Sequence, residues 1–285
     1  ALSVATMMFH STVSLMYGLR RYGDVLVVEA ALAIFQIVVL VGLLWTDRLT
    51  TTSAVLTMTV GPALGAIQLI KVSGAWNRRR SVRDASPWRT LILGGLSPMA
   101  GKISFFLAVR VGRIILAIVA GTRSLGVLAV ALAVPEALRI LPKAVAQVVA
   151  DRARSGIDSV ATARRHIRLF IVGHGVILAV SAAAGWVLVP VVFGEGFTGA
   201  RDVLVVVTAA EAVLAVHFMH QALLVGFARP KGIGVPEVVG AVVMVVLTLV
   251  MIPRWGMQGA AWATLFGFSA LALTSTIWTN YELRR

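Results

Sequence analysis

Cysteine is absent from the 285 residues, so this chain can form neither disulfides nor thiolate metal sites. Charge is scarce as well, since Asp, Glu, Lys and Arg make up 13% of the chain, about half the share found in an ordinary soluble domain. The sequence also lacks a phosphate loop, an HExxH pair, a GxSxG elbow and an acidic DxD cluster. We therefore expect no bound metal, no cofactor and no enzymatic activity.

Long apolar stretches take the place of these features. Hydrophobic residues make up 59% of the chain, and the mean hydropathy is +0.91. Runs of about 18–25 apolar residues are long enough to cross a hydrocarbon core of about 30 Å. The runs are 1–17, 24–45, 52–71, 90–120, 124–149, 168–193, 202–226, 233–252 and 257–279. The sequence thus predicts an all-α, polytopic helical membrane protein with about nine transmembrane helices.

The basic residues alternate between the loops. Loops on one side hold 17 Lys and Arg, the loops on the other side hold four, and five more lie within apolar runs. Such a bias is typical of the positive-inside rule. It predicts a cytoplasmic C-terminus in a multi-pass protein, and it accounts for the net charge of +14 without a nucleic-acid partner.

Two loops on the predicted cytoplasmic side are long. Residues 72–89 form the most polar stretch and predict a basic cytoplasmic linker between two helical lobes, 1–71 and 90–285. Residues 151–168 are consistent either with an interfacial helix or with a solvated loop.

Charges within two apolar runs give the first indication of function. At 100° per residue, the cations of run 90–120 fall within an arc of about 80°, and the charges of run 124–149 within about 60°. Ionised groups at bilayer depth are costly, so we expect them to line a wet interior that suits an anion. These residues are Lys102, Arg110, Arg113, Glu136, Arg139 and Lys143. Pro135 and Pro142 lie beside two of them and predict helix kinks at the same level.

Arginine suits phosphate because its guanidinium stays charged and binds oxygens in pairs. Arg110 and Arg113 are therefore the first candidates for substrate binding, with Arg139 and Lys102 as further candidates. The alternative for the first two is that they extend toward the membrane surface.

Two acids are candidates for ion coupling. Glu136 could pair structurally with Lys102, pair with Arg139 three residues later, or act as a proton-coupled carboxylate. Glu211 is expected to be a lone buried acid in run 202–226 and is a candidate for coupling or for a contact with a neighbouring helix. His217, His220 and Gln221 share one face of the same helix and predict a polar cavity lining.

Sequence patterns near the C-terminus resemble a known family. Residues 188–232 contain P-x-x-F-G-x-x-F, and residues 247–278 contain I-P-x-x-G-x-x-G-A-A-x-A-T. Residues 96–151 add two proline-containing helices with an R-x-x-R element, and 17–24 resemble a helix link. In order and spacing these stretches are similar to polysaccharide (O-antigen type) flippases of the multidrug/oligosaccharidyl-lipid/polysaccharide (MOP) exporter superfamily.

The resemblance implies two six-helix lobes around a central cavity, with alternating access as the mechanism. By this resemblance the chain is a fragment lacking the first three spans, so its N-terminal lobe is incomplete and 90–285 is the complete C-terminal lobe. The implied substrate is an oligosaccharide linked to a polyprenyl pyrophosphate in the bacterial cytoplasmic (inner) membrane. Membrane lipids and other polysaccharide-assembly proteins are the implied partners.

Three alternatives remain open at this point. A drug or cation antiporter of the same superfamily should have a more acidic or aromatic cavity. A membrane-embedded polysaccharide polymerase should have a large outward loop with catalytic residues, whereas the outward loops here are short. A non-catalytic assembly scaffold would tolerate loss of the charges within its helices.

Overall fold

The structure is a computed structural model that describes residues 8–9, 12–13, 16, 22–48, 50–73, 88–227 and 233–284. Within these ranges the chain forms helices and turns and no β-strand, which confirms the all-α class. The helices are α2 (Tyr22–Trp45), α3 (Thr51–Ser73), α4 (Trp88–Leu138), α5 (Ile140–Arg154), α6 (Val160–Phe193), α7 (Ala200–Gly226) and α8 (Gly234–Glu282).

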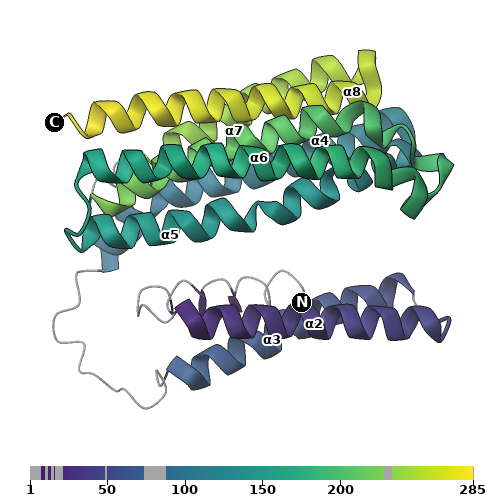
Figure 1. Cartoon of the computed structure of the whole chain (residues 1–285), viewed down its shortest axis with the longest axis horizontal. Coiled ribbons are helices and arrows are strands. Elements are labelled where there is room, and N and C mark those ends of the chain that lie inside the picture. The colour runs from purple at the N-terminus through teal and green to yellow at the C-terminus, as the bar shows by residue number, and fades with distance from the viewer. Residues whose placement is uncertain are drawn as a thin grey trace. The chain divides into compact units, whose positions relative to one another are not determined.

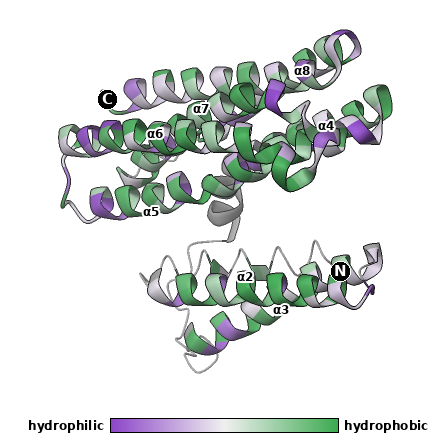
Figure 2. Ribbon diagram, turned by 45° about the vertical axis from the view of Figure 1, so that its right-hand side comes forward, coloured by the Kyte–Doolittle hydropathy of each residue, from purple (hydrophilic) through white to green (hydrophobic). Residues whose placement is uncertain are grey.

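Six of the described helices are long and apolar enough to cross a membrane. Figure 2 colours most of their length as hydrophobic, with hydrophilic positions where α5 and α6 approach the turn that joins them. The structure thus shows a multi-pass helical architecture. The predicted run 1–17 falls mostly outside the described residues, so the count of nine helices stays a prediction.

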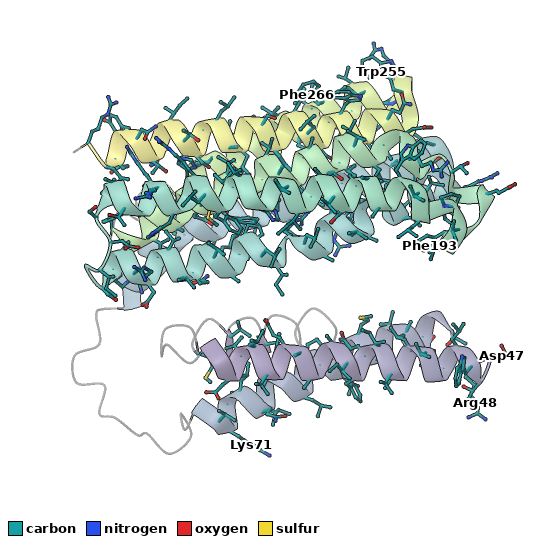
Figure 3. The ribbon with its side chains drawn as sticks, in the orientation of Figure 1. Asp47, Arg48, Lys71, Phe193, Trp255 and Phe266 are labelled. Carbon is teal, nitrogen blue, oxygen red and sulfur yellow. The ribbon has the colours of Figure 1, made fainter. Side chains whose placement is uncertain are left out.

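The chain divides into two compact units, Ala1–Ala85 and Ser86–Arg285 (Figure 1). The division falls within the predicted linker 72–89, most of which lies outside the described residues. In the first unit α2 packs against α3, and Val25, Ala66 and Leu69 are buried in an apolar cluster that also includes Phe9 and Met16. Asp47 and Arg48 lie at the turn that joins the two helices (Figure 3).

Two of the long helices in the second unit are hairpins. α4 is interrupted at Gly121, with φ 83° and ψ 161°, and α8 at Gly256, with φ 52° and ψ −126°. These positive φ angles favour glycine, because a side chain there meets its own backbone. We refer to 88–120 and 122–138 as the first and second arms of α4, and to 234–255 and 257–282 as the first and second arms of α8.

These four arms, with α5, α6 and α7, cover the six segments predicted between 90 and 279, because the second arm of α4 and α5 together correspond to the predicted run 124–149. One boundary differs from the prediction. The sequence placed a loop or an interfacial helix over 151–168, whereas α5 continues to Arg154 and α6 begins at Val160. Ser159 explains the early start, because its side chain accepts a hydrogen bond of 3.2 Å from the backbone N–H of Thr162 and caps the helix.

Small residues let the helices of the second unit approach closely. α4 and α7 each pack extensively along α8. Between the two arms of α8, a Cβ added at Gly240 would lie 2.7 Å from Leu271, and one at Gly267 would lie 2.5 Å from Met244. Such contacts are typical of membrane helices, whose association depends on close packing.

A break between α4 and α5 positions the charged residues. Pro142 has no backbone N–H and its ring crowds the carbonyl four residues earlier, at Leu138, where α4 ends. The backbone N–H of Arg139 then bonds to the carbonyl of Glu136 at 3.2 Å, a tighter turn than the α-helix. The kink predicted from the prolines therefore lies at Arg139.

Candidate functional site

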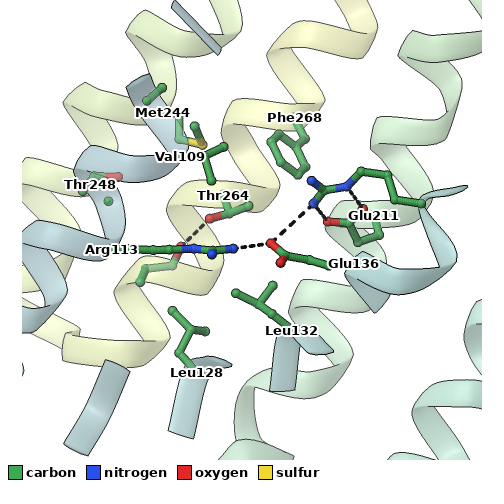
Figure 4. Close-up of a pocket in the computed structure, with 14 residues that line it drawn as sticks. Val109, Arg113, Leu128, Leu132, Glu136, Glu211, Met244, Thr248, Thr264 and Phe268 are labelled. Atoms are coloured by element: carbon green, nitrogen blue, oxygen red, sulfur yellow. Dashed lines mark hydrogen bonds and ion pairs between the residues drawn. The ribbon is translucent and has the colours of Figure 1, made fainter. Parts of the chain in front are cut away.

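Four charged side chains from α4, from α7 and from the break between α4 and α5 meet inside the second unit (Figure 4). Arg113 on the first arm of α4 forms an ion pair with Glu136 on the second arm. Arg139, at the break before α5, forms an ion pair with Glu211 on α7. The Nη2 of Arg139 also lies 3.6 Å from Oε1 of Glu136, which joins both pairs into one network.

The two pairs differ in how deeply they lie. The side chains of Arg113 and Glu136 are 32% and 30% exposed, whereas those of Arg139 and Glu211 are 18% and 3% exposed. Arg139 also binds Glu211 through two nitrogens, with Nε donating to Oε2 at 2.8 Å. A guanidinium that donates twice to one carboxylate is fixed in orientation. The network therefore has a fixed inner pair and a more accessible outer pair.

A small cavity of about 40 Å³ lies beside the network. Its lining includes all four charged residues, together with the hydroxyls of Thr248 and Thr264 on the two arms of α8 and the ring of Phe268 (Figure 4). A volume of this size holds only a few water molecules. A sugar phosphate therefore cannot enter it in this conformation, and a large ligand can reach the network only from its exposed side.

The structure distinguishes between the alternatives for the two acids. Glu211 makes a contact outside its own helix, one of its two predicted roles, because Arg139 pairs with it across 72 positions of the chain. Among the described residues, Glu136 lies near Arg139, as one alternative predicted, and pairs with Arg113 rather than with Lys102. The cluster of two arginines and two carboxylates is thus balanced in charge, where the sequence alone indicated an excess of cations.

The other two cations predicted for substrate binding lie outside this cluster. The guanidinium of Arg110 is exposed and lies 5.1 Å from the centroid of the Phe106 ring, a cation–π arrangement. Lys102 is exposed two turns earlier on the same arm of α4. Neither residue lines the cavity, so the structure brings Arg113 and Arg139 together and leaves Arg110 and Lys102 at the surface of the second unit.

Thr248 and Thr264 could not be identified from the sequence, since single hydroxyl residues in apolar helices carry no distinctive pattern. Their place is set by the hairpin at Gly256, which folds the two arms of α8 onto each other beside α4. The pairing of Arg139 with Glu211 could not be predicted from the sequence either, because it depends on how α7 packs against α5.

Two solved structures resemble this fold. The chain aligns with "Outward-facing conformation of a multidrug resistance MATE family transporter of the MOP superfamily" at a TM-score of 0.65 and 15% identity, over 90% of this chain and 61% of that one. It aligns with a crystal structure of a MATE mutant at a TM-score of 0.63 and 15% identity, over 80% of this chain and 56% of that one. The chain thus spans less than two thirds of either structure.

No protein-family model and no curated protein matches the sequence. The structural likeness shows that this chain shares the fold of these two MATE structures. It agrees with the helical architecture expected of the MOP superfamily and does not test the resemblance to polysaccharide flippases. A fold does not itself specify a substrate, which must be argued from the site.

Proposed function

We propose that this chain is part of a membrane transporter of the MOP type that moves a lipid-linked oligosaccharide across the bacterial cytoplasmic membrane by alternating access. The observation that carries the proposal is the set of cations on the first arm of α4. Arg113 belongs to a network that is balanced in charge, and the same arm carries two further cations outside that network, Lys102 and Arg110, which are exposed. An excess of cations within the membrane-spanning helices favours a substrate that carries phosphate over a cationic drug.

The exposure of each side chain suggests its role in transport. Arg113, Arg110 and Lys102 lie on one arm of α4 and are accessible at least in part, so they are the groups proposed to contact the pyrophosphate. Arg139 is held by the buried Glu211, and its proposed role is to keep the network in place. Guanidinium groups are suited to both tasks because they donate to two oxygens at once.

Glu136 is the better candidate for ion coupling of the two acids. It is 30% exposed and shared between two arginines, so a phosphate that takes Arg113 would free it to bind a proton or cation. Glu211 is 3% exposed and bound twice by Arg139, which favours a structural role. The substrate and the coupling ion then compete for the same network, and such competition couples the binding of one to the release of the other.

The test uses the full-length protein in a bacterium that lacks its own polysaccharide flippase. The wild type should restore surface polysaccharide, and the double substitution Arg110→Ala/Arg113→Ala should abolish the restoration at equal membrane expression. Arg123→Ala is a matched control, since this exposed arginine lies in α4 next to the Gly121 break and outside the network. Restoration by the double variant would refute the assigned site, and failure of the wild type in several sugar backgrounds would refute the proposed substrate.

A drug or cation antiporter is the second candidate. It is favoured by one observation, namely that a structure with this fold is titled as a multidrug resistance transporter. The same cells separate the two candidates. Efflux of cationic dyes by the wild type, with no gain of surface polysaccharide, would favour the antiporter.

A further inference from the structure

A second group of polar side chains is buried in the same unit, toward the end where α7 leads into α8. His217 and Gln221 come from α7, Glu237 from the first turn of α8, and Ser275 from the second arm of α8. The Nδ1 of His217 lies 2.6 Å from the hydroxyl of Ser275, and its Nε2 lies 3.6 Å from Oε1 of Glu237. Gln221 donates to the same Oε1 at 3.2 Å.

The carboxylate of this group is enclosed and only half satisfied. Glu237 is 5% exposed and His217 is 2% exposed. Among the described residues, Oε2 of Glu237 has no hydrogen-bond partner. A Cβ added at Gly101 on α4 would lie 2.1 Å from this oxygen and 2.6 Å from the Cα of Gly234. Oε2 of Glu237 therefore faces a close contact between α4 and α8, and only glycine at position 101 allows this contact.

No fixed cation compensates this carboxylate within the described part of the chain. His220 on α7 engages a backbone carbonyl, and Arg164 on α6 donates to Asn280. Lys102 follows Gly101 on α4 but is exposed. A bare carboxylate surrounded by apolar helices is strongly unfavourable, and a single positive charge would neutralise it.

We propose that His217 and Glu237 together bind one proton, and that this buried pair is a proton-binding site separate from the network of Arg113, Glu136, Arg139 and Glu211. The lack of free space around Oε2 of Glu237 favours a proton over a metal cation, because Gly101 and Gly234 lie close to this oxygen. With its proton the pair is neutral, and without it the pair is a buried anion that weakens the contact of the first turn of α8 with α4. The inference does not depend on the identity of the transported molecule.

Proton linkage provides the test. The proposal requires the folded pair to hold one proton at pH values above about 6.5, at which a histidine in an unfolded chain has lost its proton. Folding then takes up one proton, and the ratio of folded to unfolded protein should fall by about tenfold per pH unit above that point. We would measure reversible unfolding of the full chain between pH 6 and 9 for the wild type and for Glu237→Gln, which keeps the shape and cannot bind the proton. The difference in unfolding free energy between the wild type and Glu237→Gln should become less favourable to the wild type as the pH rises. Titration of the other histidines does not affect this difference, because both proteins contain them.

Matched variants make the outcome decisive. Glu195→Gln, an exposed acid in the short 3-10 helix before α7, should follow the wild type. His217→Gln should remove the same pH dependence, and the double variant should remove no more than either change alone. His217→Gln also carries the test if Glu237→Gln does not fold. A difference that is independent of pH would overturn the proposal. So would stabilisation of the wild type, but not of Glu237→Gln, when sodium replaces choline at fixed pH.

Discussion

The network of ion pairs predicts two very different coupling energies for two chemically identical pairs. In Arg139–Glu211 the carboxylate is 3% exposed and accepts two hydrogen bonds, whereas in Arg113–Glu136 both side chains are about a third exposed. Removing one partner of a buried pair costs about 3–5 kcal/mol, because the other charge is left behind without compensation. Exposed pairs contribute about 0.2–1 kcal/mol.

Two double-mutant cycles test this difference. One cycle combines Arg139→Gln with Glu211→Gln, and the other combines Arg113→Gln with Glu136→Gln. We expect a coupling energy of about 2–3 kcal/mol for the inner pair and below about 1 kcal/mol for the outer pair. The inner value would also exceed the roughly 0.6 kcal/mol that is typical of hydrogen bonds between membrane helices.

The assay is reversible unfolding of the purified full chain in mixed micelles, with helix content followed as the denaturing detergent is increased. Each cycle needs two single variants and the double variant, and at the inner pair the double variant should cost about 2–3 kcal/mol less than the sum of the two single changes. Equal coupling energies in the two cycles, or a larger one at the outer pair, would refute the distinction between a fixed and an exchangeable pair.

Three further predictions concern the helices. Gly267→Leu should destabilise the contact between the arms of α8 by about 1–3 kcal/mol, while Gly126→Ala, with nothing within 4 Å, should not destabilise it; thermal unfolding of both variants checks this. Gly121→Ala should cost about 1–3 kcal/mol, because φ 83° with ψ 161° is essentially restricted to glycine, and the same assay measures it. Hydrogen bonds from Arg152 lower the pKa of Asp158, so its contribution to stability is present above the ordinary pKa and is lost as pH falls through the lowered value. Asp158→Asn should accordingly make the peptide bond after Arg154, at the start of the 155–159 turn, more sensitive to trypsin at neutral pH, and cleavage that matches the wild type would contradict this.

The sequence predicted the helices well, because apolar length and turn glycines act locally. The interruptions at Gly121 and Gly256 fall where the predicted segments end, and the break at Arg139 follows from Pro142. The predicted start of α6 came too late, because the polar residues 151–168 were interpreted as a solvated loop or a separate interfacial helix, whereas Ser159 caps the start of α6 there.

Partners within the site were harder to predict. Arg113, Glu136 and Arg139 were identified as charges on two neighbouring helices, but periodicity cannot specify which carboxylate each guanidinium meets. That choice depends on packing between distant segments, as in the pair of Arg139 with Glu211. The buried Oε2 of Glu237, which has no hydrogen-bond partner among the described residues, could not be predicted for the same reason. The close contact at Gly101 that encloses this oxygen joins α4 to α8.

The most direct test of the central claim is translocation by the purified full-length protein in liposomes. The wild type should move a fluorescent lipid-linked oligosaccharide between leaflets, and Arg113→Gln should slow it by about tenfold or more, since hydrogen bonds to a charged group contribute about 1.5–3 kcal/mol. Arg123→Gln should match the wild type. Movement of cationic dyes without movement of the oligosaccharide lipid, or full activity in Arg113→Gln, would contradict the account.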